Sequence, residues 1–148
     1  MIILNQKNPL WRNKKIGKSQ SSIGEFGCTI SCLSMISDWY KKYKNPEWMS
    51  DNLSFTPDGR IFWTSITESE LPMKFVYRYY AKDDAKIKKI LASKDGTCIL
   101  QVNNNHWVFL IGYSKILGYK VADPFYGDTT YLLPRRYKVT GFTELIRK

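Results

Sequence analysis

Cysteine and histidine are scarce in this chain of 148 residues, which has three cysteines and a single histidine. Cys28, Cys32 and Cys98 lack the paired C-x2-C spacing of structural zinc sites, and one histidine excludes a histidine-rich metal centre. An odd number of cysteines also argues against a disulfide framework, and it is typical of reduced thiols in a reducing compartment. The sequence therefore predicts neither a metal site nor disulfide bonds.

Long hydrophobic segments are also absent. The apolar start at residues 2–4 ends at Asn5-Gln6-Lys7, far short of a signal-peptide core, and no stretch approaches membrane-spanning length. We therefore expect a soluble protein with no membrane span that is cytoplasmic at synthesis. A phage particle or the cell wall stays open as a later destination, because a phage or holin-dependent route needs no signal segment.

Acidic residues are few beside basic ones, with 13 Asp and Glu against 23 Lys and Arg and a formal net charge of +10. This excess suits an anionic partner such as nucleic acid, a membrane surface or a cell-wall polymer. The basic residues are scattered in short clusters, however, without the spacing of a zinc finger or a helix-turn-helix. Solvated faces account for most of the charge, and nucleic acid is a disfavoured partner.

Hydrophobic residues make up 43% of the chain, enough for one core and a single domain over residues 1–148. After a short strand at 2–4 and irregular chain to 27, apolar spacing predicts a helix that begins at Thr29, is buried on several sides, and stops before Asn45-Pro46. Further segments are predicted as helices at 46–53, 63–69 and 83–93 and as strands at 75–80, 97–102, 107–113, 118–122 and 128–133. The last four strands form an antiparallel meander. The expected fold class is α+β, with a central N-terminal helix packed on a C-terminal antiparallel sheet.

Cys28 stands between Gly27 and the first residues of the predicted central helix. The positive end of the helix dipole and the unpaired backbone N–H groups there favour the reactive thiolate, and Gly27 leaves space beside the sulfur for a substrate carbonyl. Cys32 should face the core one turn later, and Cys98 falls inside a predicted strand. Because free cysteines are commonly inert packing residues, position alone does not make Cys28 a nucleophile.

His106, the only histidine, precedes the apolar run 107–111, and Asp123 ends the run 119–123 just before Pro124. If the strands 107–113 and 118–122 form a hairpin, His106 and Asp123 meet at one end of it. Cys28, His106 and Asp123 then supply a nucleophile, a base and a group that orients the base, which is the arrangement for thiol attack on acyl groups. A loop histidine and a turn aspartate are the alternative interpretations.

Several segments occur in the order found in a known family: Gln6, Pro9-Leu-Trp11, the stretch Ser-Ile-Gly-Glu-Phe-Gly-Cys at 22–28, and residues 98–102, 106–113 and 119–124. On these segments, which span nearly the whole chain, the sequence resembles the bacteriocin-processing peptidase-like group of papain-fold cysteine peptidases. The resemblance implies a papain-like fold. It also implies that the Gln6 side chain and the backbone N–H of Cys28 hold the oxyanion of a tetrahedral intermediate. Thr29-Ile30 stand where the family usually has a small residue and a proline.

The sequence thus predicts a cysteine peptidase or amide hydrolase that works through an acyl-enzyme and needs no metal or organic cofactor. Its expected partner is a peptide or protein substrate. Two alternatives stay open: a peptidoglycan cross-link endopeptidase of phage or bacterial lysis, and a catalytically inactive adaptor of the same fold that holds nucleic acid or a protein. The presence of all four candidate residues argues against the adaptor.

Overall fold

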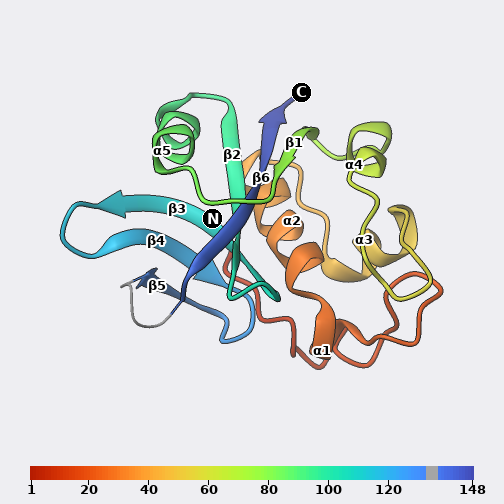
Figure 1. The fold of residues 1–148 in the computed structure, drawn as a ribbon. Coiled ribbons are helices and arrows are strands. Elements are labelled where there is room, and N and C mark those ends of the chain that lie inside the picture. The colour runs from red at the N-terminus through yellow and green to blue at the C-terminus, as the bar shows by residue number, and fades with distance from the viewer. Residues whose placement is uncertain (133–136) are drawn as a thin grey trace.

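A six-stranded antiparallel sheet separates four N-terminal helices from a fifth helix in the computed structural model, which describes residues 1–132 and 137–148 (Figure 1). The helices are α1 (Ile23–Phe26), α2 (Cys28–Trp39), α3 (Pro46–Asn52), α4 (Thr64–Glu68) and α5 (Asp84–Ala92). The strands are β1 (Met73–Tyr79), β2 (Gly96–Val102), β3 (His106–Ser114), β4 (Gly118–Asp123), β5 (Asp128–Leu132) and β6 (Val139–Arg147). In the sheet they lie in the order β1-β6-β2-β3-β4-β5.

Helix α2 is the predicted central helix, and it begins at Cys28, one residue earlier than expected. It is buried nearly all round, and two of its three serines are satisfied locally: the Ser34 hydroxyl donates to the Ile30 carbonyl at 2.9 Å and the Ser37 hydroxyl to the Ser34 carbonyl at 2.7 Å. The helix ends at Trp39, shortly before Lys41 adopts a φ of 67°. A helix without a polar face can therefore serve as the centre of the molecule.

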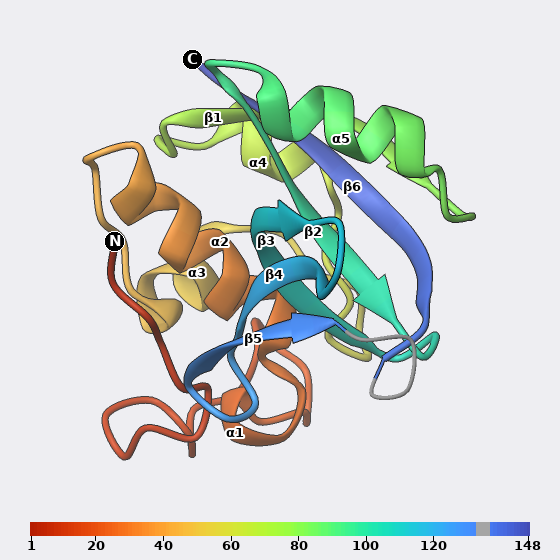
Figure 2. The same cartoon turned by 90° about the vertical axis from the view of Figure 1, so that its left-hand side faces the viewer.

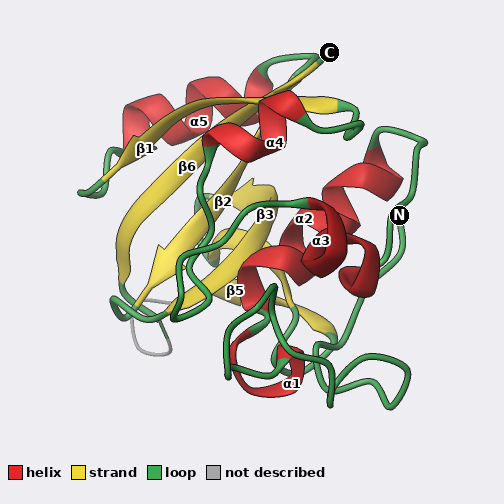
Figure 3. Cartoon of the chain, turned by 90° about the vertical axis from the view of Figure 1, so that its right-hand side faces the viewer, coloured by secondary structure: helices red, strands yellow, loops and turns green. Residues whose placement is uncertain are grey.

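The middle of the sheet is buried on both faces. Ile99 and Phe109 pack among the residues of α2 and α3, whereas Leu100 and Val108 join Ile87 of α5 in a second apolar cluster. Figure 2 shows α5 on one side of β2 and β6 with α2 and α3 on the other, and Figure 3 shows the same layers from the opposite side. Burial on both faces explains why β2 and β3 read as continuous apolar runs without polar alternation.

The predicted meander is confirmed for β2 to β5, although Leu133 of the predicted strand 128–133 lies outside the described residues. Strand β6 was not predicted, and it lies between β1 and β2. Strand β6 contains Gly141, and a glycine weakens the sequence pattern that is typical of a strand. A Cβ at Gly141 would lie 2.7 Å from the Tyr79 carbonyl oxygen, so the close approach of β1 requires glycine there.

The predicted strand at residues 2–4 is wrong. Helix α2 satisfies this segment through side chains: the Ile2 N–H donates to Asp38 Oδ2 at 2.8 Å and the Leu4 N–H to Met35 Sδ at 3.5 Å. The irregular chain that follows is held by Ser50 of α3, whose hydroxyl oxygen accepts the Gly17 N–H at 2.8 Å. In the part of the chain that the structure describes, no helix is long and apolar enough to cross a membrane.

Candidate active site

Cys28 is the first residue of α2, directly behind the short helix α1. Gly27 joins the two helices, and its N–H donates to the Ile23 carbonyl at 2.8 Å. A Cβ on Gly27 would lie 2.4 Å from that carbonyl oxygen. The structure thus gives Gly27 a different role from the expected one: the glycine lets the chain turn tightly from α1 into α2, rather than leaving space beside the sulfur.

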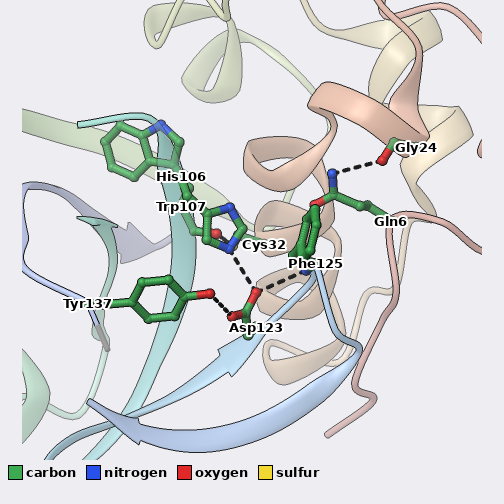
Figure 4. A network of polar contacts seen from close by, with 8 residues as sticks. All are labelled: Gln6, Gly24, Cys32, His106, Trp107, Asp123, Phe125 and Tyr137. Atoms are coloured by element: carbon green, nitrogen blue, oxygen red, sulfur yellow. Dashed lines mark hydrogen bonds and ion pairs between the residues drawn. The ribbon is translucent and has the colours of Figure 1, made fainter. Parts of the chain in front are cut away.

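The hairpin of β3 and β4 brings His106 and Asp123 together at one end, as the sequence predicts. His106 Nε2 lies 2.8 Å from Asp123 Oδ1 (Figure 4). The Cys28 side chain lies close enough to the imidazole to raise the pKa of His106. Since Nε2 is engaged by Asp123, Nδ1 is the nitrogen left for Cys28. The side chain of His106 is 15% exposed, which leaves one edge of the ring accessible.

Asp123 is fully buried and accepts three hydrogen bonds from residues that the structure describes. Oδ1 accepts from His106 Nε2 at 2.8 Å and from the Phe125 backbone N–H at 3.0 Å, and Oδ2 accepts from the Tyr137 hydroxyl at 2.7 Å. Burial by itself would raise the pKa of the Asp123 carboxyl, but the hydrogen bonds from His106 and Tyr137, and the positive charge of His106, outweigh it and lower the pKa. Asp123 is therefore an anion at neutral pH.

The imidazole of His106 is held in its charged form. Burial lowers the pKa of His106, but the hydrogen bonds to Asp123 and Cys28 and the negative charges of these two groups outweigh it, and the pKa rises to about 9. A proton thus stays on His106 at neutral pH, next to the sulfur of Cys28. This geometry suits a thiolate and imidazolium pair.

The other two cysteines have different surroundings. Cys32 is fully buried, its Sγ donates to the Trp107 carbonyl at 3.6 Å, and burial raises its thiol pKa well above the ordinary value. Burial also raises the thiol pKa of Cys98 in β2. Cys32 and Cys98 are therefore packing residues.

Gln6 is buried, with 1% of its surface exposed, and it bridges two parts of the site. Its backbone N–H donates to the Pro124 carbonyl at 2.8 Å, and its side-chain Nε2 donates to the Gly24 carbonyl at 3.1 Å, just ahead of Cys28 (Figure 4). Within residues 1–132 and 137–148, the amide oxygen of Gln6 has no hydrogen-bond partner. A buried polar group without a partner costs about 1–3 kcal/mol of stability.

Three residues beside the site were missed by the sequence reasoning. The Phe125 ring lies 6.0 Å from the His106 ring, edge to face, and Lys7 Nζ lies 3.7 Å from the centre of the Phe125 ring. Tyr137 contacts His106 and Asp123 from the chain ahead of β6. Phe125 was detectable as the second residue after Asp123, whereas no local signal marks Tyr137. No group of three His, Cys, Asp or Glu side chains suited to a metal ion occurs among the described residues.

Comparison with known proteins identifies the fold. No protein-family model matches the chain, and no curated protein matches it. Among solved structures, it is similar to a double glycine motif protease from an AMS/PCAT transporter, crystallised in complex with the leader peptide. The two share 20% sequence identity over 95% of this chain and 96% of that chain, with a TM-score of 0.62. The predicted fold class is confirmed: an α+β, papain-like peptidase fold.

Proposed function

We propose that this protein is a cysteine-type peptidase that cleaves a peptide or amide bond through an acyl-enzyme. The observation that carries the proposal is the meeting of three groups in a papain-like fold: Cys28 at the start of the buried helix α2, the His106 imidazole that it influences, and Asp123, which accepts a hydrogen bond from His106 at 2.8 Å. The similar protease was crystallised with a leader peptide, which supports a peptide as the substrate class.

The reaction follows from the charges at the site. The Cys28 thiolate attacks the carbonyl carbon of the substrate, and the carbonyl electron pair moves onto oxygen. When this intermediate collapses, the C–N bond breaks and the amine leaves with the proton from His106, so that Cys28 holds the acyl group as a thioester. His106 then removes a proton from water, the hydroxide attacks the thioester, and the Cys28 thiolate departs. Asp123 keeps the imidazole oriented through both steps.

Gln6 and the start of α2 provide donors for the negatively charged oxygen. The amide nitrogen of Gln6 carries two N–H groups, and the Gly24 carbonyl takes one of them. The second N–H and the backbone N–H of Cys28 hold the oxyanion. One such donor is worth about 3 kcal/mol of barrier, so Gln6→Ala should lower kcat by about a hundredfold.

A cleavage assay on a diverse peptide library tests the function. New peptide ends are identified by mass spectrometry after incubation with the wild type, with Cys28→Ala and with Cys32→Ala. Cleavage by the wild type and by Cys32→Ala, with none by Cys28→Ala, is the expected result. Cys32→Ala is a matched control because it removes a thiol one helical turn away. Cleavage that persists in Cys28→Ala, or its absence in the wild type, would contradict the proposal.

A further inference from the structure

Among the contacts of the described residues, Tyr137 is the one group that hydrogen-bonds Oδ2 of the Asp123 carboxylate. His106 and the Phe125 N–H both bond Oδ1, whereas the Tyr137 hydroxyl bonds Oδ2 at 2.7 Å (Figure 4). The Tyr137 ring also lies 5.8 Å from the His106 ring, tilted by 48°. Tyr137 therefore contacts both members of the Asp123–His106 pair.

We propose that Tyr137 is a positioning residue, whose hydroxyl keeps the Asp123 carboxylate ionised and turned toward His106. Two bonds hold Oδ1, and the bond from Tyr137 holds Oδ2, so that both oxygens of the carboxylate are fixed by donors. The inference rests on the proposed function, because it assigns Tyr137 a part in the same reaction. Tyr137 itself does not touch the reacting atoms; it acts through Asp123.

Among the described residues, the charged and titratable groups that interact with Asp123 are His106 on β3, Tyr137 ahead of β6 and Cys32 on α2, with Cys28 beyond the imidazole. His106 is the only cationic partner of Asp123 among the ion pairs of the described residues. The ionisation of a buried carboxylate depends strongly on the donors that it has.

Removal of the Tyr137 hydroxyl should change the pH dependence of the site. Without this donor the pKa of the Asp123 carboxyl rises, so the carboxyl takes up a proton at a higher pH. Protonated Asp123 no longer stabilises the imidazolium beside Cys28, and alkylation of Cys28 then slows. The acid limb of Cys28 reactivity should therefore move up by about one pH unit in Tyr137→Phe, with little change above neutral pH.

The test measures the rate at which iodoacetamide alkylates Cys28 between pH 4 and pH 8, with the labelled peptide identified by mass spectrometry. Tyr79→Phe is the matched control, because the Tyr79 hydroxyl also donates to a carboxylate, Glu144 Oε1 at 3.1 Å, in a different part of the sheet. The expected result is an acid limb that rises in Tyr137→Phe and stays in place in Tyr79→Phe. An unmoved or lower limb, an equal shift in the control, or a uniform loss of rate at every pH would overturn the proposal.

This readout needs no substrate, so its outcome is separate from that of the peptide-cleavage assay. Failure of the wild type to cleave peptides contradicts the proposed function, whereas the alkylation profile still reports on Tyr137. Thermal unfolding checks that each variant is folded. If Tyr137→Phe does not fold, Tyr137→Met also removes the donor at this half-buried position and should show the same shift of the acid limb.

Discussion

Replacement of Asp123 by Asn removes a charge from the site but keeps its shape. The Asn carbonyl oxygen can accept the two donors that Oδ1 now accepts, His106 Nε2 at 2.8 Å and the Phe125 N–H at 3.0 Å. The Asn amide group then faces the Tyr137 hydroxyl, which can rotate to accept from it. The opposite orientation would place an amide N–H against two other donors. One orientation is therefore favoured, and the variant tests electrostatics rather than packing.

The size of the effect follows from the pKa of His106, which is about 9 against an ordinary value of 6.5. Asp123 and Cys28 both raise this pKa, while burial opposes them. Loss of an opposite charge at hydrogen-bond distance changes a pKa by about 1–3 units. We expect Asp123→Asn to lower the pKa of His106 by about 1.5 units, or ~2 kcal/mol. Because the leaving amine takes its proton from His106, the alkaline limb of kcat/KM should move down equally.

Histidine NMR measures this pKa directly, since His106 is the only histidine of the chain. The ring signal should titrate at about pH 9 in the wild type and at about pH 7.5 in Asp123→Asn. Asp128→Asn is the control, because Asp128 is exposed and is the β5 partner of Asp123 in the sheet register. A wild-type midpoint near the ordinary value, or a midpoint that Asp123→Asn leaves unchanged, would refute the reasoning.

Three further changes test the fold around the site. Gly27→Ala places a Cβ 2.4 Å from the Ile23 carbonyl oxygen. It should lower the free energy of unfolding by about 1–3 kcal/mol in urea titrations and abolish peptide cleavage. A variant with unchanged stability and cleavage would contradict the tight turn. Ser50→Ala removes the acceptor of the Gly17 N–H and should cost about 0.5–1.5 kcal/mol of stability. Hydrogen exchange at Gly17 should be faster than in the wild type, and unchanged exchange there would count against the contact. Phe142→Ala removes a fully buried ring that stacks on the Tyr79 ring, with 4.3 Å between the ring centres. It should lower the free energy of unfolding by about 3–5 kcal/mol, whereas Phe62→Ala, at a half-exposed position, should lower it far less. Similar losses of stability in the two variants would argue against this core.

Much of the fold was predictable where burial is regular along the chain. The spacing of apolar residues predicted helix α2. Short runs of β-branched and aromatic residues between turns predicted strands β2 to β5. The segment at 2–4 and strand β6 were not predictable in this way. The first has a strand-like composition but its N–H groups bond side chains of α2, and the second contains a glycine required by its neighbour β1. Both depend on contacts distant in sequence.

In the candidate site, too, contacts local in sequence were predictable and contacts distant in sequence were not. A hairpin is a local structure, so the meeting of His106 and Asp123 followed from the order of residues. Gln6 could equally have been an exposed polar residue near the start of the chain, and only its burial excludes that interpretation. Tyr137 had no signal at all, because its contact with Asp123 depends on how the chain returns ahead of β6. The catalytic roles of Gln6, Cys28, His106 and Asp123 stay predictions.

The place of β6 in the sheet has a consequence for synthesis. This strand follows the other five in the chain, yet it lies between β1 and β2. A nascent chain that ends before residue 137 has already made Cys28, His106 and Asp123, but it lacks Tyr137 and the strand that joins β1 to the rest of the sheet. Such long-range pairing forms late in folding. On the ribosome, therefore, Cys28, His106 and Asp123 are made early, but the contact of Tyr137 with Asp123 and the complete sheet form only after β6 has emerged.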